Sequence, residues 1–190
     1  MHFTLREHIR KFVSLSESEV QVLNHFVKSK SFKKKEFLLS GGQVCRSMYF
    51  VEKGCVRMFF INEKSAEQIT QFAIDGWWIA DYTSFNDNEA SEYFIQTIEP
   101  SVMKSIDIAV LDDLLKELPQ LERYFRIIWL KNMAASQLKS KQLFEMSKEE
   151  FYYHFSTSYP EFMQRVPQYM VASYLGLTPE YVSELRKKKS

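Results

Sequence analysis

The sequence of 190 residues has few of the residues that mark disordered, fibrous, disulfide-rich or membrane-spanning chains. Proline and glycine occur five times each, which is too few for a disordered or collagen-like protein. Cys45 and Cys55 are the two cysteines, and without a CxxC pair or a third ligand they fit neither a zinc site nor an iron–sulfur cluster. We therefore expect both thiols to be buried small side chains. No stretch approaches ~18 consecutive apolar residues, so no membrane span is predicted.

The chain also lacks an excess of either charge, because 25 basic and 24 acidic residues leave a net charge of +1. The charges are nevertheless sorted along the sequence. Residues 1–35 hold 8 basic and 3 acidic groups, residues 36–107 hold 5 and 11, and residues 139–190 hold 8 and 6. An acidic middle between more basic ends excludes a nucleic-acid binder that is basic throughout, but allows a local basic patch.

Periodicity divides the chain into a helix, a strand region and a helical C-terminal part. Ser16 and Glu19 have the spacing of a capping box, which predicts a helix over residues 16–28, and Ser147 with Glu150 predicts the start of a later helix in the same way. Residues 37–106 hold short runs rich in Phe, Tyr, Val and Ile, with turn residues such as Gly54 roughly every ten positions, as in an antiparallel sandwich or barrel. Helical periodicity returns after Asp107. The predicted fold class is α+β, with an antiparallel β-barrel or jelly roll followed by helices.

The long helix predicted over residues 119–146 has one face that resembles a partner seam. The seam positions recur at intervals of three and four, and are apolar in the first half and polar in the second: Leu121, Phe125, Ile128, Asn132, Ala135, Lys139 and Gln142. We therefore predict a homodimer formed by this helix against its symmetry mate. The predicted division is a barrel with its N-terminal helix over residues 1–118, a dimerisation helix over 119–146 and a small all-helical domain over 147–190.

The sequence holds no residue pattern for enzymatic chemistry. The four histidines, His2, His8, His25 and His154, lie outside the strand region, which excludes a two-His-one-carboxylate metal site inside the barrel. No GxSxG sequence and no Cys–His pairing is evident. We predict no catalytic residue, no metal and no cofactor. Charged residues near the N-terminus, where a signal peptide would have its apolar core, predict a cytoplasmic protein without a membrane partner.

The last 25 residues have the pattern of two short helices joined by a tight turn. Gly176 forms the turn, Thr178 caps the second helix, and Ala172 is small enough to let the helices approach closely. A lysine run beginning at Lys187 ends the second helix. This combination is typical of a helix-turn-helix, whose second helix lies in the major groove of DNA. The alternative is a terminal helical hairpin that only packs on the barrel.

The order of the elements and three stretches of sequence resemble the CRP/FNR family of bacterial transcription regulators. The stretches are FLLSGG at 37–42, MYFVEKGCVRM at 48–58 and VASYLGLTPEYVSELRKK at 171–188. The chain looks most like the short members, in which the DNA-binding region stops just after the recognition helix. The resemblance implies a homodimer that binds double-stranded DNA, with RNA polymerase as a further partner, and a barrel that senses a small-molecule effector.

The expected effector pocket departs from the family members that bind cyclic nucleotides. Those members carry a Gly-Glu pair for the ribose and, further along, an Arg-Ser or Arg-Thr pair for the cyclic phosphate. Here Ala80 and Asp81 replace the first pair, and Ser91 and Glu92 replace the second. An anionic phosphate would meet a carboxylate in place of a guanidinium. The FNR-type cysteine cluster is also missing, so the resemblance leaves the effector unidentified.

The second helix of the tail supplies the DNA contacts that the resemblance implies: Thr178, Glu180, Tyr181, Ser183, Glu184, Lys187 and Lys188. Thr178 would hold a phosphate, Tyr181 and Glu184 would point at base edges, and the lysines would contact the backbone. Glu184 stands where relatives usually place an arginine, which keeps open a degenerate helix-turn-helix that acts through protein contacts. A basic surface combining Arg165 with the terminal lysines would favour DNA, whereas an acidic or occluded helix would favour protein contacts.

Overall fold

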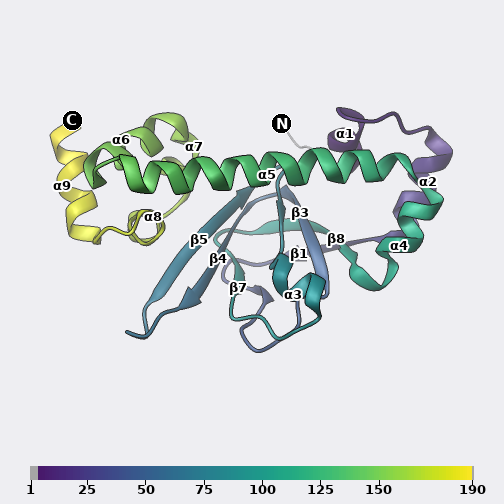
Figure 1. The fold of residues 1–190 in the computed structure, drawn as a ribbon, viewed down its shortest axis with the longest axis horizontal. Coiled ribbons are helices and arrows are strands. Elements are labelled where there is room, and N and C mark those ends of the chain that lie inside the picture. Colours follow the sequence, from purple (N-terminus) through teal and green to yellow (C-terminus); the bar gives the residue numbers. More distant parts are fainter. Residues whose placement is uncertain (1–3, 190) are drawn as a thin grey trace.

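Two four-stranded antiparallel sheets face each other across a hydrophobic core, and helices lie at both ends of them (Figure 1). The computed structural model describes residues 4–189, with side chains through Lys188. One sheet has the strand order β1-β8-β3-β6 and the other β2-β7-β4-β5. The strands are β1 (Val27–Phe32), β2 (Phe37–Leu39), β3 (Ser47–Lys53), β4 (Cys55–Ile61), β5 (Glu67–Ile74), β6 (Trp78–Ile79), β7 (Phe94–Thr97) and β8 (Ser101–Asp107). The predicted α+β class with an antiparallel barrel or jelly roll is confirmed.

Gly54 lies where the chain passes from one sheet to the other, between β3 and β4. Its φ of 118° falls in the region that favours glycine. A Cβ atom on Gly54 would lie 2.1 Å from Oγ of Ser101, closer than any side chain tolerates. Glycine is therefore required here both by the backbone conformation and by the close approach of β8.

The helices at the N-terminal end begin at capping boxes. Helix α1 spans Leu5–Arg10 and α2 spans Glu17–Phe26, with α4 (Ile108–Glu117) packed beside α2. The hydroxyl of Ser16 accepts from the Glu19 N–H, and the Glu19 carboxylate accepts from the Ser16 N–H at 2.7 Å. The capping box predicted at Ser16 is confirmed, because both of its hydrogen bonds form within four consecutive residues.

Helix α2 ends earlier than predicted, at Phe26, because strand β1 begins at Val27. Strand β1 pairs with β8 from Val27 opposite Ile106 to Phe32 opposite Ser101. The four side chains between these ends are exposed, so the strand shows little of the apolar alternation by which a strand is predicted. The short helices α1 and α3 (Tyr82–Asp87) were also not predicted.

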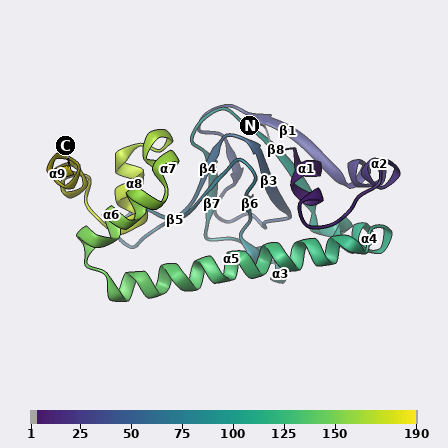
Figure 2. The ribbon, with the colours of Figure 1, turned by 90° about the horizontal axis from the view of Figure 1, so that it is seen from above.

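Helix α5 (Gln120–Glu145) runs along the whole molecule and links the barrel to the C-terminal helices (Figures 1 and 2). Leu121, Phe125 and Ile128 are buried against the barrel core. The dimer seam predicted for the first half of this helix is therefore wrong, since these side chains fill the chain's own core. Neither α5 nor any other helix in the described part of the chain is long and apolar enough to cross a membrane.

Four helices follow α5: α6 (Lys148–Ser158), α7 (Pro160–Arg165), α8 (Gln168–Leu175) and α9 (Pro179–Lys189). The capping box predicted for Ser147 and Glu150 begins α6. These helices lie beside the strands, against the outer face of β4 and β5 (Figure 2). Cys55, Phe59 and Phe72 of the strands share one hydrophobic core with them.

The division into residues 1–118, 119–146 and 147–190 stays a prediction. The hydrophobic core shared by the strands and the C-terminal helices joins the first predicted part to the last one, because side chains of β4 and β5 pack among those of α6 to α9. The C-terminal helices are therefore supported by the barrel and do not hang from it by α5 alone.

A buried hydrogen-bonded trio joins α1, α5 and β6. Trp78 Nε1 donates to the hydroxyl of Tyr124 at 2.7 Å, which leaves the phenolic proton for Nδ1 of His8 at 2.8 Å. Burial, followed by the charges of Lys11 and Lys131, lowers the pKa of His8 to about 4. The folded protein therefore holds this imidazole in its neutral form, as an acceptor for Tyr124.

This trio predicts a loss of stability on mild acidification. Below pH ~6.5 His8 is protonated in the unfolded chain, whereas in the folded chain it stays neutral until about pH 4. The free energy of unfolding therefore falls as the pH falls through this window. We expect His8→Gln, which keeps an acceptor but cannot titrate, to reduce this loss by about 1–2 kcal/mol after allowance for the partly exposed ring. Urea unfolding at pH 7 and pH 4.5 measures the difference. His25→Gln, which replaces an exposed histidine of α2, is the matched control and should keep the wild-type loss.

Candidate nucleic-acid interface

Helices α8 and α9 form the two-helix unit on which the predicted DNA contacts lie. Gly176 ends α8 in the left-handed conformation, with φ of 68°, and the Leu177 N–H donates to the carbonyl of Ala172 at 2.9 Å. Ala172 is fully buried, as are Val182 and Leu185 of α9. The tight turn and the small residue expected from the sequence thus occur in the structure, and they fix which face of α9 points outward.

The outer face of α9 carries charges of both signs. Glu180, Glu184, Lys187 and Lys188 are exposed, and Ser183 is half-buried beside them. Acidic side chains occupy the first half of this face and basic side chains the last turn. The helix is therefore accessible, but its N-terminal half presents carboxylates where DNA would present phosphates.

Two of the predicted contact residues also serve the fold of the helix pair. Tyr181 is half-buried and packs against the core of the C-terminal helices, so its ring lies on the flank of α9 and not on its outer face. The hydroxyl of Thr178 accepts from the Tyr181 N–H at 3.2 Å and so caps the helix. The expectation that Tyr181 shares an outward face with Glu184 is corrected by this packing.

Arg165 does not join the terminal lysines in a basic surface. Its guanidinium donates to Asp75 at 2.8 Å and to Glu99 at 2.6 Å, and it also pairs with Glu161. Asp75 follows β5 and Glu99 precedes β8, so this arginine joins α7 to the barrel. The basic surface that would have favoured DNA is therefore reduced to the last turn of α9.

The position of α8 is set by strand β5, which is the edge of its sheet. The Ile69 N–H donates to Oγ of Ser173 at 3.0 Å, and that hydroxyl donates to the carbonyl of Glu67 at 2.8 Å. Phe72 of β5 packs against Tyr174 with ring centres 5.2 Å apart. The serine of α8 was not singled out in the sequence, because nothing near it in the chain shows that a strand edge lies opposite.

The residues predicted for the effector pocket do not line an open site together. Ala80, Asp81 and Ser91 are buried, whereas Glu92 is exposed. Asp81 caps α3 by accepting from the N–H groups of Thr83 and Ser84, and its Oδ2 accepts from the Ser91 hydroxyl at 2.6 Å. The structure thus brings Asp81 and Ser91 into direct contact, where they close the loop between α3 and β7.

The barrel interior is filled in part by aromatic side chains. Trp78 is buried in the barrel core, whereas Trp77 is partly exposed and packs against Phe162 of α7. Phe94 lies on the outer face of its sheet, stacked on Phe59 with ring centres 5.1 Å apart. Of these three aromatic side chains, only Trp78 fills the barrel.

The cysteines and histidines hold no metal-binding cluster. Cys45 and Cys55 are buried and free, as the sequence predicts. Burial raises the pKa of Cys55 to about 12, so its thiol stays protonated at neutral pH. In residues 4–188 no three His, Cys, Asp or Glu side chains gather as metal ligands. His2 lies outside the described residues.

Comparison with known proteins places this architecture among transcription regulators. Residues 29–117 match the family model of the cyclic nucleotide-binding domain. The fumarate and nitrate reduction regulatory protein of Vibrio cholerae is 29% identical over 90% of this chain and 73% of its own length. The regulatory protein HlyX of Actinobacillus pleuropneumoniae is 27% identical over 90% of this chain and 76% of its own.

Solved structures share the fold over most of the chain. The c-di-GMP responsive global regulator CLP of Xanthomonas campestris has a TM-score of 0.73 at 14% identity and covers 91% of both chains. FixK2 of Bradyrhizobium japonicum has a TM-score of 0.69 at 17% identity, over 85% of this chain and 83% of its own. Together with the barrel, the long helix and the terminal helix pair, these likenesses define a fold built on a cyclic nucleotide-binding type of barrel. The chain is thus similar to regulators of the CRP/FNR type over most of its length.

The contact between Asp81 and Ser91 predicts that the barrel binds neither cAMP nor cGMP. A cyclic phosphate placed near Ser91 would meet the Asp81 carboxylate and no guanidinium, an unfavourable burial that we expect to cost at least a few kcal/mol. Isothermal titration with either nucleotide should show no binding tighter than about 100 µM. Micromolar binding of either nucleotide would contradict this assignment of the pocket residues.

Proposed function

We propose that this protein is a DNA-binding transcription regulator that acts as a homodimer, with α9 as the helix that enters the major groove. The observation that carries the proposal is the exposed outer face of α9, held by Gly176, Ala172 and the buried side chains of the α8–α9 unit. The relatives that match 90% of the chain are regulatory proteins. Within the same proposal, RNA polymerase is the further partner, and no enzymatic activity is assigned.

The homodimer in this proposal uses a strip of α5 that the barrel leaves uncovered. Trp129, Met133 and Leu143 are between 40% and 60% exposed, which is unusual for such large apolar side chains. With Ser136 and Ser140 they follow the spacing of four and three that coiled-coil seams use. We call these five residues the α5 strip, and it replaces the buried residues of the seam predicted from the sequence.

The α5 strip predicts a variant that dissociates the dimer without unfolding the chain. Met133→Glu places a carboxylate at the centre of the strip, where its side chain is 60% exposed in one protomer. We expect the mass in solution to fall from twice 22.6 kDa to 22.6 kDa at micromolar concentration, as measured by light scattering. Leu138→Glu, a similar change at an exposed position off the strip, should leave the dimer intact. A wild-type monomer, or dissociation by both variants alike, would contradict this interface.

In this dimer the two α9 helices would bind half-sites about one helical turn, ~34 Å, apart. Lys187 is exposed in the last turn and would contact phosphate, as would Lys188, whose Nζ lies 3.8 Å from the Glu149 carboxylate. Ser183 and Glu184 would face base edges, with Glu180 at the start of the helix. Thr178 would add a phosphate contact at the helix N-terminus. Because Glu180 and Glu184 oppose the phosphate charge, we expect binding weaker than the ~10⁻⁸ M of typical specific regulators.

Two substitutions on α9 test DNA binding. Lys187→Ala should weaken binding to all duplexes alike and lower the slope of log K against log salt by about 1, because one phosphate contact is lost. Glu184→Ala should change the sequence preference and strengthen non-specific binding. Fluorescence anisotropy with a pool of duplexes from the source genome measures both effects, and Lys141→Ala on α5 is the control for a lost exposed lysine.

The same experiment separates this proposal from a degenerate helix-turn-helix that acts through protein contacts. That alternative has specific support in Arg165, which is occupied by carboxylates of the barrel and of α7. If no duplex binds at low salt, or if Lys187→Ala and Glu184→Ala leave binding unchanged, the alternative holds. An intact dimer with no DNA affinity would then identify the C-terminal helices as a protein-binding unit.

A further inference from the structure

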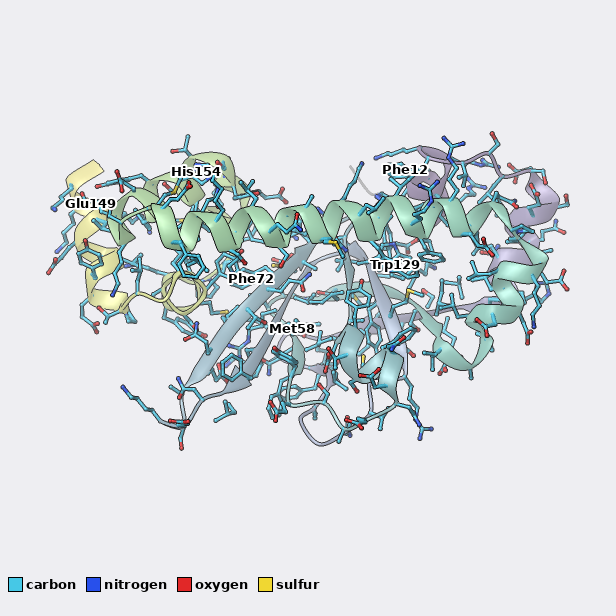
Figure 3. The ribbon with its side chains drawn as sticks, in the orientation of Figure 1. Phe12, Met58, Phe72, Trp129, Glu149 and His154 are labelled. Carbon is cyan, nitrogen blue, oxygen red and sulfur yellow. The ribbon has the colours of Figure 1, made fainter. Side chains whose placement is uncertain are left out.

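A large groove lies between α5, strand β5, helix α3 and the C-terminal helices. It encloses about 1160 Å³ and is lined by residues from all of these elements. Aromatic side chains from several elements form part of its walls, among them Phe72, Phe85, Trp129, Phe155, Phe162 and Tyr174. Phe72 and Trp129, labelled in Figure 3, come from β5 and from the middle of α5. Asp81, Ser91 and the described residues of α9 do not line the groove.

The groove contains one ammonium group with an unusual environment. Lys139 of α5 donates from Nζ to the carbonyl of Thr70 at 3.0 Å, and Nζ lies 3.7 Å from the ring centre of Tyr174. Within the described part of the chain, no carboxylate lies within 4 Å of this ammonium. Desolvation alone lowers the pKa of Lys139 to about 8.

A cation that is largely removed from water and has no anionic partner is costly to bury, and an anion brought beside it restores the missing interaction. The dipole of the carbonyl and the quadrupole of the ring attract the ammonium, but neither carries a net negative charge that would neutralise it. The aromatic walls around Lys139 favour flat apolar groups, which stack against rings at little entropic cost. Both features select the same chemistry, a flat apolar body that carries one negative charge.

We propose that this groove binds a small aromatic monoanion, such as an aromatic carboxylate or sulfonate, with its anionic group on the Lys139 ammonium and its ring against the aromatic wall that includes Phe72 and Phe155. The inference rests on the proposed function and adds the sensing of a small molecule to it, because the groove is shared by the barrel and the helices that precede α9. Its binding step does not depend on DNA binding and is tested without DNA.

Lys139 lies outside the α5 strip, although the sequence placed it in the dimer seam. Its ammonium is directed at β5, whereas Met133 and Leu143 of the strip are exposed. The groove borders the strip at Trp129, Met133 and Ser136. The dimer partner would therefore lie at the rim of the groove, with the Lys139 end left to the ligand.

The fluorescent anion 1-anilinonaphthalene-8-sulfonate is a suitable probe, because it combines two aromatic units with one sulfonate. We expect it to bind the full-length protein at pH 7, and to bind Lys139→Met roughly tenfold more weakly. Lys139→Arg, which keeps the charge, should stay within about threefold of wild type. Lys141→Met, an exposed lysine of the same helix, should leave the affinity unchanged. N-phenyl-1-naphthylamine, which lacks the sulfonate, should bind all four proteins alike.

The pH dependence gives a second readout that needs no variant. Raising the pH through about 8 removes the charge of Lys139, so the affinity of wild type for the sulfonate should fall between pH 7 and pH 9.5. The other titratable side chains that line the groove are Tyr82, Asp87, Asp112, His154, Tyr159 and Tyr174. These side chains are also present in Lys139→Met. The affinity of this variant for the sulfonate should stay constant between pH 7 and pH 9.5, and so should the affinity of wild type for the neutral probe.

Three results would overturn the proposal. Equal sulfonate affinity in wild type and Lys139→Met would show that the ammonium does not hold the anion. A parallel loss of the neutral probe in that variant would show that the substitution only disrupts the groove. Failure of both probes to bind wild type would show that the partner protomer or the C-terminal helices fill the space. If Lys139→Met does not fold, the wild-type pH profiles of the two probes decide, and a flat sulfonate profile overturns the proposal.

Discussion

The sheet formed by β2, β7, β4 and β5 is covered on both faces, and the rest of the structure depends on this burial. Its inner face completes the barrel core, and its outer face forms the second core with the C-terminal helices. Strands buried on both faces lose the polar alternation of a half-exposed strand. Strand β4 shows this, because Val56 belongs to the first core, and Cys55 and Phe59 belong to the second. The helices therefore hold a defined position relative to the barrel.

This arrangement also explains why the C-terminal helices lack a strong positive field. Arg165 is used to join α7 to Asp75 and Glu99 of the barrel, and Lys139 faces the groove. The cations that remain for phosphate lie in the last turn of α9, beyond two exposed carboxylates. Docking of the C-terminal helices onto an acidic barrel and binding of a polyanion would use the same few basic residues. In this chain Arg165 serves the docking.

The features that could be predicted from the sequence are those encoded within a few consecutive residues. The capping boxes at Ser16 and Ser147 and the turn at Gly54 are of this kind, and all three are confirmed. The periodicity of α5 correctly showed that Ile128 lies on a buried face. It could not show whether that face meets the barrel or a second chain, because partners far apart in sequence are decided by packing. The two barrel carboxylates that pair with Arg165 lie 66 and 90 positions away, so their pairing leaves no local pattern.

Ser173 of α8 occupies hydrogen-bonding groups at the edge of strand β5. Its hydroxyl satisfies backbone groups on the free edge of β5, where another strand would otherwise add. A barrel separated from its C-terminal helices would present an unpaired strand edge beside a bare aromatic surface, a combination that drives self-association into extended sheets. The docked C-terminal helices thus cover an edge that would otherwise be open to strand addition, and a movement of these helices away from the barrel would expose it.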